Sequence, residues 1–443
     1  MPRSSISRYF NAGPDIDPAA SQALQAAVAD KLMRQTENAV LNYVTTSADP
    51  GITLAALQAL FDLPPERRTG VLQHPAFRYW LQVMRRTSAG EHGEIRDTFA
   101  QRIVDFVWPQ QLAAGSLDRT WPAVTDELGG LRCAPFGRYI ELGAAYRNQL
   151  VKISPRSENA VIRCADGLEI QVPPEDLVHA VTDPPTVEAH GYTLTMSSRA
   201  ADGRVEVSNR DPWLRVRLTG TNQRTDGTEF LGVNNDLYPA SFSADEIDGA
   251  LALLRRYWPK AHDDLAEFTR VIVPIVAPGA SVPPRDNSSA PTNERHHAHI
   301  AFTVSSRQGA IYIGPAPPDA SVEMILHENA HVKLRQLQAV DSLLCDPLDE
   351  TVKIPVPWRP DPRPIPGILE GLFVFCHVAE FESQRYRADP GAVTMNQVKK
   401  RLEGLSYAVD CLDRHAKLTA EGAEFLAMCK RWVSDLRCRV PGF

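Results

Sequence analysis

The sequence predicts an α+β protein of several domains. Apolar residues recur at helical spacing in long segments before residue 128, and short strand-like runs separated by turn residues fill much of 129–239. After residue 240, strand-like and helical patterns alternate. Because 443 residues are enough for two or three domains, we divide the chain into 1–128, 129–239 and 240–443.

Residues 1–128 are expected to form a helical domain. A long amphipathic pattern runs from Ser21 to Tyr43, and further helical patterns lie at Thr53–Phe61 and Glu94–Ala113. No residue combination in this region indicates chemistry, so the expected role is structural support.

Residues 129–239 are expected to form a small β-rich module. The runs Asn159–Cys164 and Leu168–Val172 flank Asp166-Gly167, which predicts a hairpin. Three further strand-like runs follow: Tyr192–Met196, Arg204–Val207 and Trp213–Leu218. The module either holds a peptide by adding a strand to an open edge or serves as packing scaffold, and the scaffold role is favoured.

The region from 240 to the end is expected to alternate helix and strand. A helix is predicted at Ala244–Trp258 and a buried strand at Phe268–Val276. A Pro- and Ser-rich loop follows at Pro278–Pro291, and then two strands at His299–Val304 and Ala310–Ile313. The next helix is predicted from Ser321 to Leu344, with Asp319 or Ser321 as its cap.

This helix carries the sequence His327-Glu328-Asn329-Ala330-His331. Residues at i and i+4 lie on one face of a helix, so His327 and His331 can bind one divalent metal, with Glu328 beside it as a base or as an orienting partner. Zinc peptidases place a strand pair before such a helix, so a zincin-like α/β domain is expected by analogy. A histidine cluster further upstream is interpreted as a solvated loop: His296, His297 and His299.

A catalytic metal site needs a third ligand. Metzincins place Gly and His where this chain has Leu334 and Leu337, so the third ligand must come from another segment. The apolar helix predicted at Gly367–Tyr386 carries Glu370 and His377. Glu370 is the predicted ligand because it lies at the helix start, beside a loop, and His377 is the alternative. A buried structural role for Glu370 also stays open.

Between the two helices lies a segment with seven prolines, Asp346–Pro366. Proline stiffens the backbone, and Trp358–Pro364 within the segment carries Arg359 and Arg363. Two guanidiniums on a rigid loop are suited to a bidentate grip on a carboxylate. The other interpretation is a solvated linker with exposed arginines.

Composition restricts the environment and the partners. The formal charge of −7 gives no basic footprint for nucleic acid, and no apolar run reaches membrane-spanning length. Residues 1–20 contain no apolar core of a secretory signal. The seven cysteines are scattered without a C-x-x-C pair, which predicts reduced thiols in a cytoplasmic protein and argues against a cysteine-ligated zinc site.

Four segments together resemble the HExxH-motif peptide-modification proteins: the strand pair, Leu326–Leu334, Trp358–Pro364 and Gly367–Gly371. Proteins of this family are found beside ribosomally made, post-translationally modified peptides (RiPPs). The resemblance covers roughly residues 240 to 390. Some members are Fe(II)- and 2-oxoglutarate-dependent peptide β-hydroxylases, so the resemblance implies a dioxygenase acting on a precursor peptide.

In that interpretation His327, His331 and Glu370 bind Fe(II) as a facial triad, and Glu328 orients a ligand or a water molecule. Arg359 or Arg363 binds the far carboxylate of 2-oxoglutarate, with Arg307 next in order.

Two alternatives stay open at this point. In a zinc peptidase the same ligands hold Zn(II), and Glu328 is the general base for a metal-bound water. In a non-catalytic peptide-binding protein the metal is structural and fully enclosed by four ligands. Spacing alone does not separate the two enzymes, and it does not specify the oligomeric state.

Overall fold

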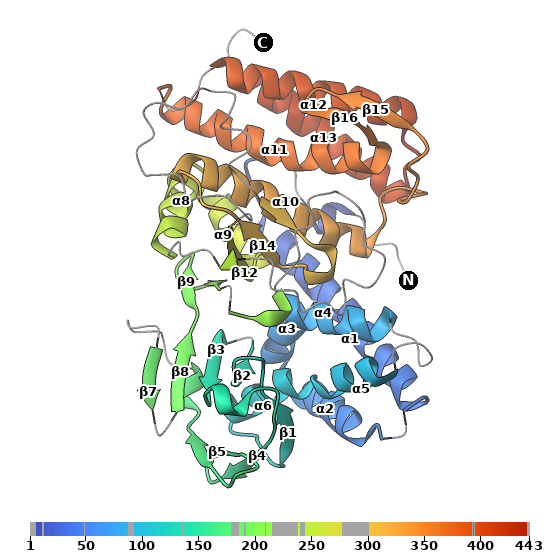
Figure 1. Cartoon of the computed structure of the whole chain (residues 1–443). Helices are drawn as coiled ribbons and strands as arrows, with labels where there is room; N and C mark the ends of the chain where they lie inside the picture. Colours follow the sequence, from blue (N-terminus) through green and yellow to red (C-terminus); the bar gives the residue numbers. More distant parts are fainter. Residues whose placement is uncertain are drawn as a thin grey trace.

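The computed structural model describes residues 6–10, 13–47, 49–86, 93–134, 136–178, 186–189, 192–208, 210–214, 238–239, 244–276, 301–391, 393 and 395–440. Helices gather at the two ends of the chain and sheets lie between them in sequence (Figure 1). Among the described residues, no helix is long and apolar enough to cross a membrane.

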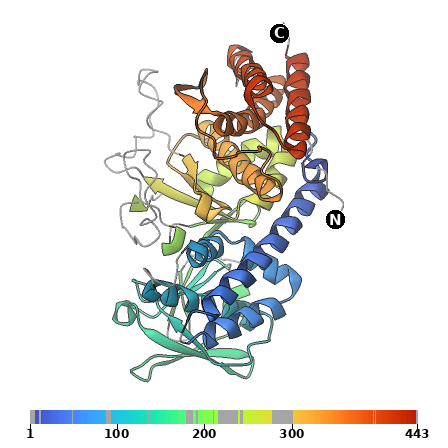
Figure 2. The ribbon, with the colours of Figure 1, turned by 90° about the vertical axis from the view of Figure 1, so that its right-hand side faces the viewer.

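The N-terminal region is helical, as predicted. Its elements are η1 (Ile6–Arg8), α1 (Pro18–Val44), α2 (Gly51–Asp62), α3 (Pro65–Gln73), α4 (Pro75–Arg86), α5 (Gly93–Gln101) and α6 (Val104–Ala113). The single helix predicted over 94–113 is wrong, because it is divided into α5 and α6. Helices α3 and α4 were not predicted, and each starts with a proline at its first position, where the missing N–H costs nothing. In Figure 2 α1, the long dark-blue helix, begins beside the C-terminal helices and runs down to the other N-terminal helices.

The β-rich module consists of two four-stranded antiparallel sheets, ordered β1-β4-β5-β6 and β2-β3-β8-β7. The elements are β1 (Trp121–Val124), β2 (Gly130–Cys133), β3 (Arg138–Glu141), η2 (Ala144–Tyr146), β4 (Leu150–Arg156), β5 (Asn159–Arg163), β6 (Glu169–Val172), α7 (Glu175–Val178), β7 (Thr186–Ala189) and β8 (Tyr192–Met196). The hairpin around Asp166-Gly167 is confirmed as β5–β6, and Gly167 takes the positive φ of 91° that the turn needs. Strand β1 precedes residue 129 yet pairs with β4.

The strand predicted over Trp213–Leu218 is wrong in its described part. Pro212–Leu214 forms a short 3-10 turn, η3, and the rest of the run lies outside the described residues. The Asp211 carboxylate accepts a hydrogen bond from the Trp213 N–H at 2.9 Å, and its carbonyl accepts one from the Leu214 N–H at 3.1 Å. These bonds close a turn, which competes with an extended strand.

A mixed sheet follows, ordered β13-β14-β12-β10-β9, with β11 also pairing with β12. Its strands are β9 (Ser198–Ala200), β10 (Val205–Val207), β11 (Tyr238–Pro239), β12 (Val271–Val276), β13 (Ala301–Thr303) and β14 (Ala310–Ile313). Helix α9 (Pro259–Phe268) was not predicted and takes Phe268 out of the predicted strand. The predicted loop over 278–291 and the histidine cluster at 296–299 lie outside the described residues.

The remaining helices are α8 (Ala244–Tyr257), α10 (Pro318–Val340), α11 (Ile365–Ala388), α12 (Met395–His415) and α13 (Ala420–Arg439). Helices α11, α12 and α13 lie together at the top of Figure 1, with α10 beneath them. The helices predicted at 244–258 and 367–386 are confirmed as α8 and α11.

The limits predicted for the histidine-bearing helix need correction. Helix α10 begins at Pro318 and has no side-chain cap, because Asp319 pairs with Arg385 at 2.9 Å and the Ser321 hydroxyl donates to the Ala316 carbonyl at 3.0 Å. It ends at Val340, since Asp341 is extended.

The proline-rich segment is not a loop. It contains a hairpin of two strands, β15 (Lys353–Val356) and β16 (Arg359–Pro364), which pair antiparallel with an irregularity between Ile354 and Val356. In a two-stranded hairpin each strand pairs along one edge only. Prolines can therefore occupy positions whose N–H would point away from the partner strand and make no inter-strand hydrogen bond.

Candidate functional site

Helix α10 is fixed from behind by buried polar contacts. The Asn329 side-chain oxygen accepts a hydrogen bond from the Thr269 hydroxyl at 2.8 Å, and the Lys333 ammonium pairs with Asp264 at 2.8 Å. Asn329 and Lys333 are both only 2% exposed. The two histidines lie on the less buried side of the helix, so their orientation depends on this anchoring.

His327 and His331 form a close pair. Their ring centroids are 5.0 Å apart with an interplanar angle of 66°. Burial lowers the pKa of His327 to about 4, with a further contribution from Arg401. Burial also lowers the pKa of His331 to about 3, followed by the effects of His327, Arg335 and Arg363. Both imidazoles are therefore neutral at neutral pH, which is the form that binds a metal.

Glu328 lies in the space between α10 and β13. Burial raises the pKa of its carboxyl to about 8, while a hydrogen bond with Thr303 of β13 acts in the opposite direction. Its Oε1 is 4.0 Å from Nε2 of His327. The glutamate is thus beside the histidine pair, as the spacing predicts.

One side of the pair is closed by aromatic residues. The Phe375 ring of α11 lies 5.3 Å from the His327 ring and 5.7 Å from the Trp358 ring of the hairpin. The Arg401 guanidinium of α12 lies 5.3 Å from the Phe375 ring. These contacts cover one side of His327 with aromatic side chains.

Two glycines let the hairpin lie against the start of α11. A Cβ at Gly371 would come within 3.0 Å of the Trp358 indole, and a Cβ at Gly367 would come within 3.2 Å of the Arg363 Nε. A side chain at either position would push the hairpin away. The Gly367–Gly371 spacing therefore serves to place Trp358 and Arg363.

Arg359 and Arg363 differ in position. Both pair with Asp361, at 3.0 Å and 3.5 Å. Arg359 is exposed, whereas Arg363 is half-buried against Gly367 and close enough to lower the pKa of His331. The structure therefore places Arg363 near His331 and leaves Arg359 exposed at the start of β16.

Arg307, the reserve cation, is engaged elsewhere. Its guanidinium lies 4.2 Å from the Tyr79 ring of α4, and its Nε donates to the Trp213 carbonyl at 2.7 Å. These contacts tie η6 (Ser305–Arg307) to the N-terminal region.

Glu370 is half-buried in the first turns of α11, between the two glycines that face the hairpin. In the described part of the chain it forms no ion pair or hydrogen bond. No group of three or more His, Cys, Asp or Glu side chains among the described residues is arranged to hold a metal. The structure thus joins His327 and His331, and the role of Glu370 as third ligand stays a prediction.

His377 lies on the core side of α11 and is 2% exposed. Its Nδ1 is 2.9 Å from the Phe373 carbonyl oxygen, and its ring packs on Phe373 and Trp432 at 4.6 and 4.9 Å. Burial lowers its pKa to about 4, with Lys333 contributing next. This packing gives His377 a structural role and leaves Glu370 as the candidate on α11.

Sequence reasoning missed several residues that act on the pair. Arg335 lies one turn after His331 on α10, so helical spacing alone could have indicated it. Thr303, Phe375 and Arg401 reach the site through tertiary packing and carry no local signal.

Comparison with known proteins gives no relative for this chain: no family model matches it, and no curated protein matches it.

Proposed function

We propose that this chain is an Fe(II)- and 2-oxoglutarate-dependent hydroxylase of a side chain in a ribosomally made precursor peptide, built on a zincin-like domain. The observation that carries the proposal is the pair of neutral imidazoles, His327 and His331, with the Arg363 guanidinium close to it. Two His ligands plus a cation for a carboxylate match the needs of a 2-oxoglutarate oxygenase.

The two imidazole nitrogens and the carboxylate available here are ligand types that Fe(II) binds in oxygenases. His327 and His331 would be the nitrogen ligands, and the unpaired carboxylate of Glu370 would be the third ligand. Bound iron would supply the redox chemistry with dioxygen. Arg363 would hold the carboxylate of 2-oxoglutarate that lies away from the metal, and Phe375 would keep water from one side of the pair.

The proposed substrate and location have separate support. Strand β13 is the last strand of its sheet in the described order, and Thr303 on it bonds to Glu328, so a peptide paired along β13 would pass beside the site. All seven cysteines are free in the structure, which favours a reducing, cytoplasmic location.

A zinc peptidase is the second candidate, and the position of Glu328 next to His327 favours it. In that case Glu328 takes a proton from water while zinc would polarise the peptide carbonyl. A guanidinium near the pair, that of Arg363, has no required role in hydrolysis, which is why the hydroxylase is the first choice. A closed structural metal site would need a fourth protein ligand.

Titration with 2-oxoglutarate tests the first choice. Chelator-treated protein is loaded with Fe(II) without oxygen, and binding is followed by calorimetry. A hydrogen bond to a charged group contributes about 1.5–3 kcal/mol, so Arg363→Ala should weaken binding roughly 10- to 150-fold. Arg359→Ala is the matched control, because Arg359 is exposed and its guanidinium pairs with the same aspartate. Absence of binding by the unmodified protein would reject the hydroxylase.

Glu328→Gln separates the two enzymes. A peptidase that loses its general base should lose about 100- to 10,000-fold in rate. A hydroxylase should lose about 10- to 100-fold in metal affinity or rate, because Glu328 only orients groups there. Complete loss of peptide oxidation with stoichiometric iron still bound would contradict that orienting role.

A further inference from the structure

A cavity of about 350 Å³ lies where α3, α6, β9, β10 and the start of β12 meet. Its lining is charged and polar, with four arginines (Arg67, Arg199, Arg204 and Arg270) together with His74 and Glu206. No Phe, Tyr or Trp is among the lining residues. The N-terminal helices and the mixed sheet both contribute to its wall.

Three of the four guanidiniums bind only neutral groups in the described part of the chain. Arg67 donates to the Gln110 side chain and the Ala113 carbonyl, at 3.3 and 3.2 Å. Arg199 donates to the Phe136 carbonyl at 2.8 Å. None of these contacts neutralises a positive charge.

Arg270 follows the same pattern, because it donates to the Ala266 carbonyl at 3.3 Å and to the Gln73 side chain at 2.6 Å. The fourth guanidinium, that of Arg204, pairs with the exposed Asp263.

Further positive charge lies behind the cavity. Burial lowers the pKa of Arg270, and burial together with repulsion from Arg270 lowers the pKa of Arg78 to about 9. Arg78 is 7% exposed and donates to the Gln308 side chain, which is again neutral. Glu267 offsets part of the charge of Arg270, and a bound anion would further lower the cost of keeping these two buried cations close together.

The two acidic residues of the wall, Glu66 and Glu206, offset only part of the charge of its four arginines, and Glu206 lies directly opposite Arg199 in the β9–β10 ladder. Glu206 is 4% exposed, accepts a hydrogen bond from the Ser197 hydroxyl at 2.7 Å and lies 3.9 Å from His74. The buried His74 Nε2 has no hydrogen-bond partner in the described structure. The His74 ring nitrogen that faces Glu206 therefore lines the cavity without a hydrogen bond of ordinary length, and His74 is 4% exposed.

From these contacts we propose that the cavity is a binding site for a phosphate group, either free phosphate or the phosphate monoester of a small polar molecule. Guanidiniums bind phosphate oxygens in a planar, two-point geometry, and the lining amides and the Thr69 hydroxyl add neutral donors. The lining has no Phe, Tyr or Trp on which successive bases could stack, which disfavours a nucleic-acid strand. The site is separate from the histidine pair and does not depend on the proposed function.

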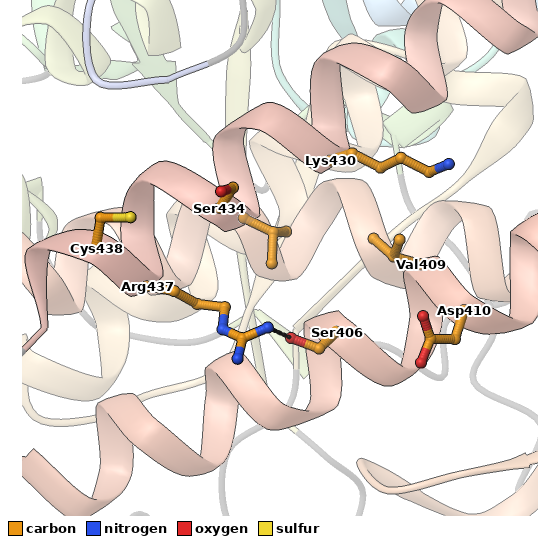
Figure 3. A pocket seen from close by; sticks show the side chains of 8 residues that line it. Ser406, Val409, Asp410, Lys430, Ser434, Arg437 and Cys438 are labelled. Atoms are coloured by element: carbon orange, nitrogen blue, oxygen red, sulfur yellow. Dashed lines mark hydrogen bonds between the residues drawn. The ribbon is translucent and has the colours of Figure 1, made fainter. Parts of the chain in front are cut away.

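A second concavity, of about 400 Å³ between α12 and α13, serves as a contrast (Figure 3). Two of its charged side chains form ion pairs, Lys430 with Asp413 and Asp410 with Arg414, and Arg437 donates to the Ser406 hydroxyl at 3.5 Å. In the first cavity only Arg204 of the four lining arginines forms an ion pair within the described part of the chain.

The test is calorimetric titration of the chelator-treated full chain with inorganic phosphate at constant ionic strength. We expect saturable one-to-one binding that Arg67→Gln and Arg199→Gln each weaken by about 10- to 100-fold, since each removes a charge-assisted bond. Arg68→Gln is the matched control, because this neighbour on α3 donates to the Phe61 carbonyl and does not line the cavity. Its affinity should stay within about twofold of the unmodified protein.

Succinate provides the second arm, because it carries two charges on carboxylates, and glycerol 3-phosphate provides the third. Binding of both phosphate compounds, with weaker succinate binding, supports the proposal. Succinate binding as tight as that of phosphate would overturn the choice of phosphate, and absence of saturable phosphate binding would overturn the site.

Protection from an arginine reagent gives a result that does not depend on the folding of any variant. Phosphate should slow the modification of Arg67, Arg199 and Arg270 by phenylglyoxal in the unmodified protein, as measured by peptide mass spectrometry. The modification of Arg68 should not change. Equal rates with and without phosphate at all four arginines would contradict the proposal.

Discussion

Replacing Lys333 by Met should destabilise the chain strongly without removing the metal site. The Lys333 ammonium and the Asp264 carboxylate are 2.8 Å apart, and their side chains are 3% and 2% exposed. The second oxygen of Asp264 accepts from the Ser21 hydroxyl at 2.5 Å, and the ammonium lies 5.0 Å from the Phe268 ring. Lys333→Met therefore leaves a buried carboxylate with one neutral partner.

Breaking a buried ion pair from one side costs about 3–5 kcal/mol, because the remaining charge stays out of water. In the double variant Lys333→Met/Asp264→Leu both charges are gone, and the Ser21 hydroxyl loses its acceptor. The free energy of unfolding of the double variant should fall by about 1–3 kcal/mol, which is less than the fall for Lys333→Met alone. The two substitutions should thus be strongly non-additive.

The assay is equilibrium unfolding in urea, followed by tryptophan fluorescence and by circular dichroism on the same samples. Iron binding to the folded variants is measured in parallel and should change little, because Lys333 is on the face of α10 away from the histidine pair. A loss below about 1 kcal/mol for Lys333→Met, or additive losses in the double variant, would refute the buried-pair reasoning.

Three further predictions concern the pair and its surroundings. As pH falls from about 6.5 toward about 4, the unfolded chain binds a proton at His377 while the folded chain does not, so the free energy of unfolding of the metal-free protein should fall by up to about 3 kcal/mol. Urea titrations at several pH values should show a shallower pH dependence of this free energy for His377→Leu, and an unchanged slope would contradict the lowered pKa. Glu370→Ala should reduce metal affinity more than His377→Leu does, as measured by elemental analysis after dialysis, and the reverse order would reject Glu370 as a ligand. Gly371→Val should displace Trp358 and weaken 2-oxoglutarate binding with metal content unchanged, whereas Gly249→Ala should have no effect on binding, because nothing lies within 4 Å of a Cβ added there. Equal binding by both variants would contradict the packing role of Gly371.

The elements that could be predicted are those with a strong local signal. The β5–β6 hairpin follows from Asp166-Gly167, and the histidine pair follows from the 3.6-residue period of α10. Helices α3 and α4 are each about ten residues long and separated only by His74. Their hydrophobic patterns are too short to be distinguished from irregular structure, because helices of this length depend on tertiary packing.

The proline-rich segment was misjudged for a different reason. Proline disfavours an interior strand but not a two-stranded hairpin, where one edge of each strand is free. The distinction between Arg359 and Arg363 depends on which end of β16 packs on Gly367, and this is a tertiary fact. The same holds for Thr303 and Phe375, which approach the histidines from other elements.

The central claim is that His327 and His331 together bind one catalytic metal. The most direct measurement is Fe(II) titration of the chelator-treated protein, of His327→Ala and of His331→Ala, with circular dichroism to verify folding. The account predicts one equivalent of tightly bound iron in the unmodified protein and loss of that binding in both folded variants. Stoichiometric iron in either variant, with the affinity of the unmodified protein, would contradict it.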